Sequence, residues 1–282
     1  MAREIKMIGL DLDGTLLTDK KELTERTKNA LKAAISQGVY VLVATGRPWM
    51  GVPEELRNFP GMEYALTSNG ARIVKTATGE VIEEHLLPPL SAKKALEICE
   101  KYDTLQEVYF DGQGYAPEEK LARVEHYHKN PNMWEYTRRT RIAVPDIFEV
   151  LEKENRGLDK TQALFADMDE RAQAWRELEQ CEDLELVGSL KYNIEINHKG
   201  VNKGTGLVNL GKILGISREE IMAFGDGDND TVMLKEVGFG VAMENGEPQV
   251  KAAADYITLS NEDDGVADAI ERFVLRGGER KC

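Results

Sequence analysis

The end of the first apolar run carries two carboxylates, Asp11 and Asp13, which stand two residues apart in the segment 11–15. In an extended strand, residues i and i+2 point to the same side, so these two side chains would lie together. Neighbouring carboxylates repel each other, and burying them is costly unless a cation or protons intervene. The alternative is a strand that breaks into a solvated Asp-Gly turn. Other segments of the chain decide between these two interpretations.

Polar residues also follow two other apolar runs and open one predicted helix. Thr45, Gly46 and Arg47 follow the run 39–44, and Lys203 begins a helical pattern. The run that begins at residue 221 is followed by the carboxylate-rich segment Gly225-Asp226-Gly227-Asp228-Asn229-Asp230. Ligands of open parallel sheets bind at the carboxyl ends of the strands, and right-handed crossovers bring these ends to one edge. We therefore expect one site with at least three carboxylates, a lysine, a hydroxyl and several backbone amides.

Such a set of charges is balanced only around a divalent cation and an anionic ligand. Carboxylate and water ligands favour Mg²⁺, which takes oxygen ligands in octahedral geometry. Zinc is disfavoured, because no histidine or cysteine belongs to the set. The four histidines are scattered away from the strand ends, and we expect surface or linker positions for them: His85, His126, His128 and His198.

Short apolar runs alternate with helical patterns at both ends of the chain, which is typical of a parallel sheet with crossover helices. The predicted strands are 5–10, 39–44, 64–67, 221–224, 239–242 and 256–258. The predicted helices are 24–37, 201–214, a segment through 235, 248–253 and 266–275, with a β-hairpin at 71–84. Thr24 is the expected N-cap of the first helix. The polar tail 276–282 is expected to fray.

The middle of the chain changes character after Pro88 and Pro89. There we predict helices at 91–99, 118–129 and 169–180, and strands at 105–110, 163–166, 184–187 and 193–196. The sequence therefore predicts an α/β fold with a doubly wound, Rossmann-like parallel sheet in a core of residues 1–86 and 197–282. An α+β cap domain of residues 87–196 is inserted after the third strand. Its compact basic cluster, 138–141, is more typical of a solvated or salt-bridged edge than of a ligand site.

Composition narrows the class of protein and of partner. A hydrophobic content of 41% with 30% charged residues is typical of a soluble globular protein. The net charge of −14 argues against nucleic acid and anionic membranes as partners, since both require clustered positive charge. No apolar stretch approaches the roughly 20 residues that span a bilayer, and the N-terminus does not resemble a signal peptide. Cys99, Cys181 and Cys282 are odd in number and widely spaced, so we expect reduced thiols in a cytoplasmic protein, two in or near the core and one on the tail. We expect a monomer or small homo-oligomer.

Four segments, 11–15, 44–47, 203–204 and 225–230, resemble in order the four motifs of the haloacid dehalogenase superfamily. The chain is similar to its Cof-type branch of phosphatases, which carry a large α/β cap of the C2B type between the second and third motifs. Segments 201–204 and 241–245 also resemble that branch, close to bacterial sugar phosphatases of broad specificity.

The resemblance implies a role for each residue of the predicted site. Asp11 would be the nucleophile that forms an aspartyl-phosphate, and Asp13 would be the general acid and base. The side chains of Asp11 and Asp226 and the backbone carbonyl of Asp13 would ligate Mg²⁺. The phosphoryl oxygens would be bound by the Leu12 and Gly46 amides, Thr45, Lys203 and Asn229. Three roles stay open: Asp230 would orient Lys203 or a metal-bound water, Arg47 would approach the phosphate or brace its loop, and Asp228 could simply be exposed.

These roles predict a Mg²⁺-dependent phosphatase acting on small phosphorylated metabolites, with sugar phosphates as the first choice. Alternatives are a phosphomutase or phosphotransferase, and a phosphatase for flavin mononucleotide or pyridoxal phosphate. A regulator that binds phosphorylated ligands without turnover is the third alternative. Both Asp11 and Asp13 speak against it, because a binding protein needs no acid or base at position 13. The cap is expected to act as a lid that limits water and selects the leaving group.

Overall fold

The computed structural model describes residues 4–275, and the chain divides into two compact units. The first unit runs up to Thr45, from Pro53 to Glu83, and from Asn202 onward. The second unit consists of Gly46–Val52 and Glu84–Val201. Residues 46–52, which directly follow Thr45, therefore group with the second unit. The predicted domain limits at 86/87 and 196/197 stay predictions.

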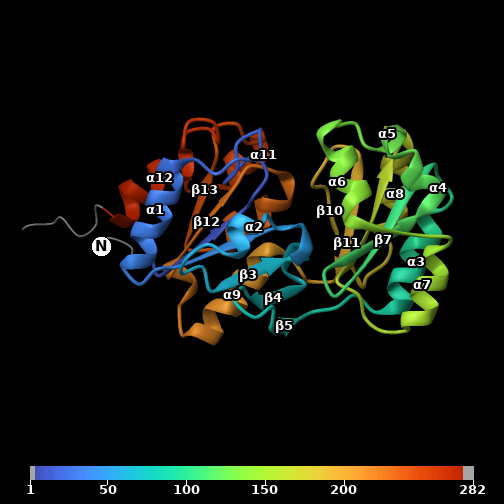
Figure 1. Cartoon of the computed structure of the whole chain (residues 1–282), viewed down its shortest axis with the longest axis horizontal. Helices are drawn as coiled ribbons and strands as arrows, with labels where there is room; N and C mark the ends of the chain where they lie inside the picture. The colour runs from blue at the N-terminus through green and yellow to red at the C-terminus, as the bar shows by residue number, and fades with distance from the viewer. Residues whose placement is uncertain (1–3, 276–282) are drawn as a thin grey trace, which may run out of the picture. The chain divides into compact units, whose positions relative to one another are not determined.

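The first unit contains an eight-stranded sheet in the order β14-β13-β12-β1-β2-β3-β4-β5 (Figure 1). The six strands from β14 to β3 pair in parallel, and β4 pairs with β3 in the antiparallel sense. This confirms the predicted α/β class with a doubly wound parallel sheet. The strands are β1 (Met7–Leu10), β2 (Tyr40–Ala44), β3 (Tyr64–Thr67), β4 (Arg72–Lys75), β5 (Val81–Glu84), β12 (Ile221–Gly225), β13 (Phe239–Ala242) and β14 (Tyr256–Ile257).

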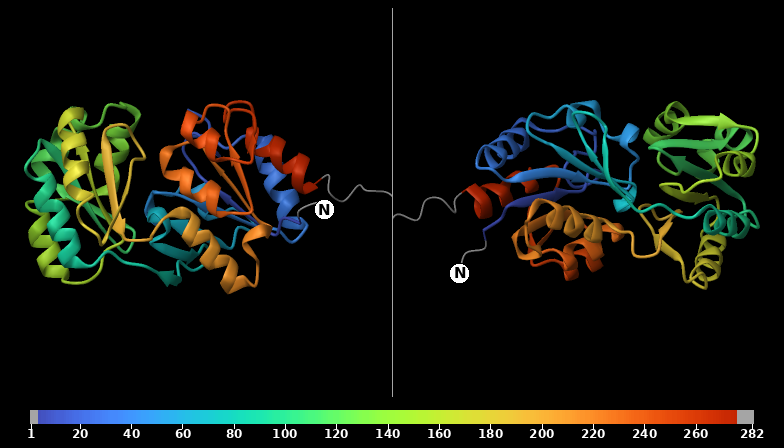
Figure 2. Two further views of the ribbon diagram at one scale, coloured as in Figure 1. Left: turned by 180° about the vertical axis from the view of Figure 1, so that it is seen from behind. Right: turned by 90° about the horizontal axis from the view of Figure 1, so that it is seen from below.

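Helices cover both faces of this sheet, which explains why its central strands are apolar throughout. On one face α1 (Glu25–Ser36) lies beside α12 (Gly265–Ile270), as Figures 1 and 2 show. Thr24 caps α1, since its side chain accepts a hydrogen bond from the Thr27 amide, as predicted. On the other face, apolar side chains of the sheet pack against α9 (Lys203–Leu214), α10 (Thr231–Glu236) and α11 (Pro248–Ala253). A short helix, α2 (Glu54–Arg57), follows residues 46–52.

The second unit contains a six-stranded sheet in the order β10-β11-β9-β6-β7-β8, which is antiparallel except for the parallel pair β7–β8. Its strands are β6 (Thr104–Phe110), β7 (Gln113–Pro117), β8 (Arg141–Val144), β9 (Lys160–Phe165), β10 (Leu184–Val187) and β11 (Asn193–His198). Its helices are α3 (Pro89–Cys99), α4 (Glu118–Ala122), α5 (Val124–Tyr127), α6 (Asn132–Thr140), α7 (Ile147–Glu154) and α8 (Met168–Leu178). Both sheets and their helices can be followed in Figure 2.

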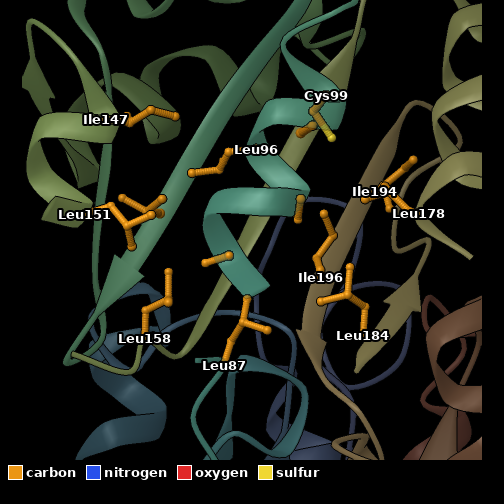
Figure 3. Close-up of a cluster of buried hydrophobic side chains, with 14 of the residues drawn as sticks. Leu87, Leu96, Cys99, Ile147, Leu151, Leu158, Leu178, Leu184, Ile194 and Ile196 are labelled. Carbon is orange, nitrogen blue, oxygen red and sulfur yellow. The ribbon is translucent and has the colours of Figure 1, made fainter. Parts of the chain in front are cut away.

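A large apolar cluster joins α3, α7 and α8 to one face of this second sheet. Figure 3 shows Leu96 and Cys99 of α3 near Ile194 and Ile196 of β11. A smaller cluster, which includes Leu121 of α4, covers part of the opposite face. The remainder of that opposite face carries buried polar and charged side chains.

Several predicted elements in the second unit were wrong or missing. The single helix predicted at 118–129 is two short helices, α4 and α5, separated at Arg123. The elements β7, α6, β8 and α7 were not predicted at all. Strand β7 contains Gly114 and Pro117, which are unfavourable strand residues, but it follows β6 through the two-residue turn Asp111-Gly112, a hairpin signal that the prediction overlooked.

One histidine prediction is also wrong. His128 is buried, with 3% of its surface exposed, because it packs against Tyr192 and shares a hydrogen bond with that hydroxyl at 2.7 Å. Cys99 and Cys181 are free and buried, as predicted, whereas Cys282 and the tail 276–282 lie outside the described residues. Within residues 4–275, none of the helices has the length and apolar character needed to cross a membrane.

Candidate active site

Three adjacent strands of the first unit bring the predicted catalytic segments to one edge of the sheet. Asp11 directly follows β1, and its amide donates a hydrogen bond to Phe224 of the neighbouring strand β12 at 3.1 Å. Thr45 follows β2 and is buried, and its amide donates to Leu66 of β3 at 3.0 Å. Asp226 follows β12. The carboxyl ends of parallel strands therefore meet here, as the motif spacing predicts.

A buried lysine links two of the carboxylates. Lys203 is the first residue of α9, which begins with a capping box between Asn202 and Thr205. The Lys203 Nζ atom lies 2.6 Å from Asp11 Oδ1 and 2.7 Å from Asp230 Oδ1. The two carboxylates raise the lysine pKa against the opposing effect of burial, so Lys203 is a cation in this site. Its ammonium fixes the position of Asp11.

Asp230 also organises the backbone of the loop after β12. Its second oxygen, Oδ2, accepts hydrogen bonds from the amides of Asp226 and Gly227, at 3.0 and 3.1 Å. Asp230 is completely buried, whereas Asp228 is exposed. One side chain therefore holds both Lys203 and the segment that carries Asp226.

Sequence reasoning missed two residues that position the first motif. The Thr15 hydroxyl donates to Asp226 Oδ1 at 2.7 Å, and the Asn245 side chain donates to the Gly14 carbonyl at 2.7 Å. Thr15 belongs to the first motif, so its type was a signal, but its direction depends on how the loop folds. Asn245 lies in the segment 241–245, whose resemblance to the family predicted no role for this side chain.

A third missed feature is the tight turn after β3. Ser68 and Asn69 are buried, and both have positive φ angles, 51° and 61°. The left-handed region is unfavourable for serine, so the turn is strained, and its Asn69 amide donates to the Thr45 carbonyl at 3.0 Å. The strained turn thus supports the Thr45 loop.

The carboxylates form a set that fits a hard divalent cation. Side-chain oxygens of Asp11, Asp226 and Asp230 all lie within 4.8 Å of one another. Burial, reinforced by the neighbouring carboxylates, raises the pKa of Asp11 well above its usual value although Lys203 acts against the shift. Burial and Asp230 raise the pKa of Asp226 to about 7. Three clustered carboxylates with one lysine need a further positive charge to be ionised together, and oxygen ligands suit Mg²⁺.

The other predicted residues lie around this set. The Asp13 carboxylate is half-exposed and forms an ion pair with Lys21 Nζ at 2.7 Å, so its side chain is not part of the carboxylate set. The amides of Leu12 and Gly46 donate to no other residue within the described part of the chain, which leaves them available to an anion. Asn229 is partly exposed in the short helical turn Asp228–Asp230.

Arg47 braces its own loop in the second unit. Its Nη1 atom donates to the Gly51 carbonyl at 3.0 Å, and its guanidinium carbon lies 5.2 Å from the centre of the Tyr136 ring. This contact matches one of the two roles that the sequence had left open.

Comparison with known proteins agrees with this geometry. Residues 8–270 match the family of haloacid dehalogenase-like hydrolases. The chain is 32% identical to the 5-amino-6-(5-phospho-D-ribitylamino)uracil phosphatase YcsE of Bacillus subtilis, over 96% of this chain and 97% of that protein.

Solved structures show the same fold. A haloacid dehalogenase-like hydrolase from B. subtilis is 29% identical, with a TM-score of 0.85 over 96% of this chain and all of that one. The subclass IIB sugar phosphatase BT4131 is 26% identical, with a TM-score of 0.80 over 95% of this chain and 98% of that one. The chain belongs to the haloacid dehalogenase-like hydrolases and is a phosphatase, a phosphoric monoester hydrolase, of that family.

Proposed function

We propose that the protein is a Mg²⁺-dependent phosphatase that hydrolyses small phosphorylated metabolites through an aspartyl-phosphate on Asp11. Sugar phosphates are the substrate class that we favour. The observation that carries this proposal is the Lys203 bridge between Asp11 and Asp230, formed beside Asp226 at the ends of adjacent strands. The Lys203 ammonium holds the Asp11 carboxylate in one orientation and provides positive charge for an incoming phosphate.

In the first step an Asp11 carboxylate oxygen attacks phosphorus, and the bond from phosphorus to the ester oxygen breaks. Asp13 gives its proton to the departing alcohol. Its half-exposed position suits this task, since a group that must gain and lose a proton needs access to water. In the second step water attacks the phosphorus of the aspartyl-phosphate while Asp13 takes a proton from that water. Inorganic phosphate and free Asp11 result.

Other groups of the chain bind the phosphoryl oxygens. The Thr45 hydroxyl, the amides of Leu12 and Gly46, Asn229 and Lys203 supply donors for them. Asp11, Asp226 and the Asp13 carbonyl would hold Mg²⁺, with Asp230 beside them. When bound, the ion neutralises charge on the phosphoryl oxygens and on the carboxylates. Phosphate monoesters hydrolyse so slowly without a catalyst that all these groups must act together.

Two relatives suggest two classes of leaving group. The sugar phosphatase BT4131 supports sugar phosphates, and the B. subtilis phosphatase YcsE supports a phosphoribitylamino-pyrimidine as a second candidate. Both are phosphomonoesters of polyhydroxylated carbon chains. A panel of phosphorylated metabolites that includes both classes would rank them by kcat/KM.

The mechanism is tested by phosphate release with Mg²⁺ present, and without any activating bisphosphate. We expect turnover by the natural chain and its loss in Asp11→Asn. Asp13→Asn should abolish turnover but leave binding of a phosphorylated ligand largely unchanged. Turnover that survives Asp13→Asn would remove Asp13 from the mechanism, and transfer to a second sugar without net phosphate release would identify a phosphomutase.

A further inference from the structure

Each carboxylate of the first motif forms an ion pair with a different lysine. Asp11 pairs with Lys203, whose side chain is completely buried, and Asp13 pairs with Lys21 Nζ at 2.7 Å. The side chains of Lys21 and Asp13 are 39% and 40% exposed. All four residues belong to the first unit, and the Cα atoms of Asp11 and Asp13 are within about 7 Å of each other. The second pair therefore lies beside the nucleophile but faces water.

The backbone of Lys21 adopts a conformation that lysine rarely takes. Its φ angle is +64°, in the left-handed region that glycine adopts without strain. Among the described non-glycine residues with positive φ, only Lys21 and Ser68 are neither asparagine nor aspartate, and Ser68 lies in the turn that supports the Thr45 loop. An exposed ion pair adds little to stability, so stability alone does not account for a lysine at this position. Strained backbone is found preferentially at functional sites.

Two asparagines hold the loop that carries Lys21. The Asn245 side chain donates to the Gly14 carbonyl at 2.7 Å, and the Asn261 side chain donates to the Leu17 carbonyl at 3.1 Å. The two asparagines are themselves linked, because the Asn261 amide donates to Asn245 Oδ1 at 3.0 Å. Both contacts are made to backbone carbonyls. The path of the loop between the first motif and Lys21 is therefore set before any ligand binds.

A tight turn at the tip of the loop brings Lys21 back toward Asp13. The Lys21 amide donates to the Thr18 carbonyl at 2.8 Å, and the Thr18 amide donates to the Glu22 carbonyl at 3.0 Å. On the other side of the ion pair, Asp13 forms an isolated backbone bridge with Leu17. These contacts fix the backbone on both sides of the pair, so the Lys21 ammonium reaches Asp13 from a defined position.

A half-exposed carboxylate needs such a partner if it is to act as an acid and a base. The Asp13 side chain rotates about two bonds, and in water it would occupy several rotamers. Proton transfer is efficient only when the carboxylate oxygen lies within hydrogen-bond reach of the reacting group. The contact with Lys21 restricts this rotation. It also keeps the carboxylate apart from the set formed by Asp11, Asp226 and Asp230.

We propose that Lys21 is a positioning residue of the phosphatase reaction. Its ammonium holds the Asp13 carboxyl group in the orientation from which it gives a proton to the departing alcohol and later takes one from water. The inference rests on the proposed function, in which Asp13 exchanges both protons. Lys21 acts only through Asp13, in contrast to Lys203, which provides charge for the phosphate itself.

The test compares two esters that differ only in a nitro group, p-nitrophenyl phosphate and phenyl phosphate. The p-nitrophenolate anion is stable and departs without a proton, whereas phenolate departs far more readily once its oxygen is protonated. The quantity to measure is kcat/KM, because it reports on the steps up to departure of the alcohol. In Lys21→Gly we expect kcat/KM for phenyl phosphate to fall about 10-fold or more, and that for p-nitrophenyl phosphate to change less than about threefold.

Further variants separate positioning from folding. Lys21→Gly relieves the backbone strain, so its thermal unfolding midpoint should equal or exceed that of the natural chain. Lys21→Met retains a long side chain without its charge and should change the ratio of the two esters in the same way, which excludes the flexibility of glycine as the cause. Lys21→Arg keeps a cation beside Asp13 and should retain most of the natural ratio. Lys20→Gly removes the same charge at the neighbouring exposed position and should leave both esters unaffected.

The outcomes distinguish this inference from the proposed function. An unchanged ratio of the two esters in Lys21→Gly overturns the inference and leaves the proposed function intact. An equal loss on both esters with a lower unfolding midpoint also overturns it, because Lys21 would then be purely structural. The same change of ratio in Lys20→Gly would assign the effect to net charge and overturn it as well. A natural chain that releases no phosphate from these esters or from phosphorylated metabolites contradicts the proposed function, and the inference fails with it.

Discussion

A β-carbon placed on Gly14 would lie 2.8 Å from the carboxyl carbon of Asp226, closer than non-bonded carbon atoms approach. Gly14 also has a φ of +84°, a conformation that other residues adopt only with strain. Position 14 therefore requires glycine, because the Asp226 carboxylate occupies the space that any larger side chain would need. The two motifs form one packed unit, although the hydrogen bond from Thr15 to Asp226 spans 211 residues of the chain.

Gly14→Ala should lower kcat/KM by about 100-fold or more, because Asp226 must move and a displacement of about 1 Å costs that much in catalysis. Gly38→Ala is the matched control, since Gly38 has a φ of +83° but a β-carbon placed on it would have nothing within 4 Å. Both variants should lose comparable stability, on the order of 1 kcal/mol, from backbone strain. Equal activity in the two variants would show that contact with Asp226 is unimportant.

Lys203→Met should lower kcat/KM by about 100-fold or more and destabilise the first unit by about 3–5 kcal/mol. The substitution leaves Asp11 and Asp230 buried without their shared cation. Phosphate release and urea unfolding measure the two effects. The control is Lys212→Met on the same helix, at an exposed position, which should change neither. Adding Asp230→Asn to Lys203→Met should recover stability but not activity, because one buried charge is then removed.

Much of the first unit could be predicted because its strands are covered on both faces. Tyr64–Thr67 and Phe239–Ala242 have the predicted bounds, since an apolar run between turn residues is a strand buried on both sides. The meeting of Asp11 and Asp226 followed from strand ends, and that of Lys203 from its place at the start of a predicted helix. The hydrogen bond from Thr15 to Asp226 could not be predicted in this way. The direction of the Thr15 hydroxyl depends on the path of the loop, which Gly14 sets.

The second unit was less predictable, for two physical reasons. Its edge strand β8 pairs in parallel with β7 across three short helices, α4, α5 and α6, so no local turn joins these two strands. Its polar sheet face places Glu107 and Gln162 inside, and the alternation of polar and apolar residues then resembles that of a solvated strand. Arg141, with 6% of its side chain exposed, pairs with Glu107 on a distant strand, so the basic cluster 138–141 alone could not reveal its burial.

Removal of divalent cations with a chelator should abolish turnover, and added Mg²⁺ should restore it. Asp226→Asn should raise the Mg²⁺ concentration required for half-maximal activity by about 10-fold or more, because one of the clustered carboxylates is lost. Asp228→Asn, at the exposed neighbouring carboxylate, is the control and should leave this concentration unchanged. An identical Mg²⁺ requirement in both variants would place the ion elsewhere. Thermal unfolding with and without Mg²⁺ gives a second measure of binding.

Acid should destabilise the second unit through His128. Burial lowers the pKa of this imidazole to about 4, so the folded state disfavours the charged form that the unfolded chain adopts below pH 6.5. Stability is therefore complete above pH 6.5 and falls as the pH drops toward 4, by an amount on the order of 3 kcal/mol.

The three tryptophans, Trp49, Trp134 and Trp175, all belong to the second unit, so their fluorescence during urea unfolding reports on it alone. His128→Gln cannot titrate and should lose part of the pH dependence between 6.5 and 4, whereas His85→Gln, at an exposed position, should keep all of it. Because carboxylates contribute to acid unfolding in every variant, the difference between these two curves is the quantity to measure. Parallel curves would mean that His128 is accommodated as a cation, which its contact with Tyr192 inside the second unit argues against.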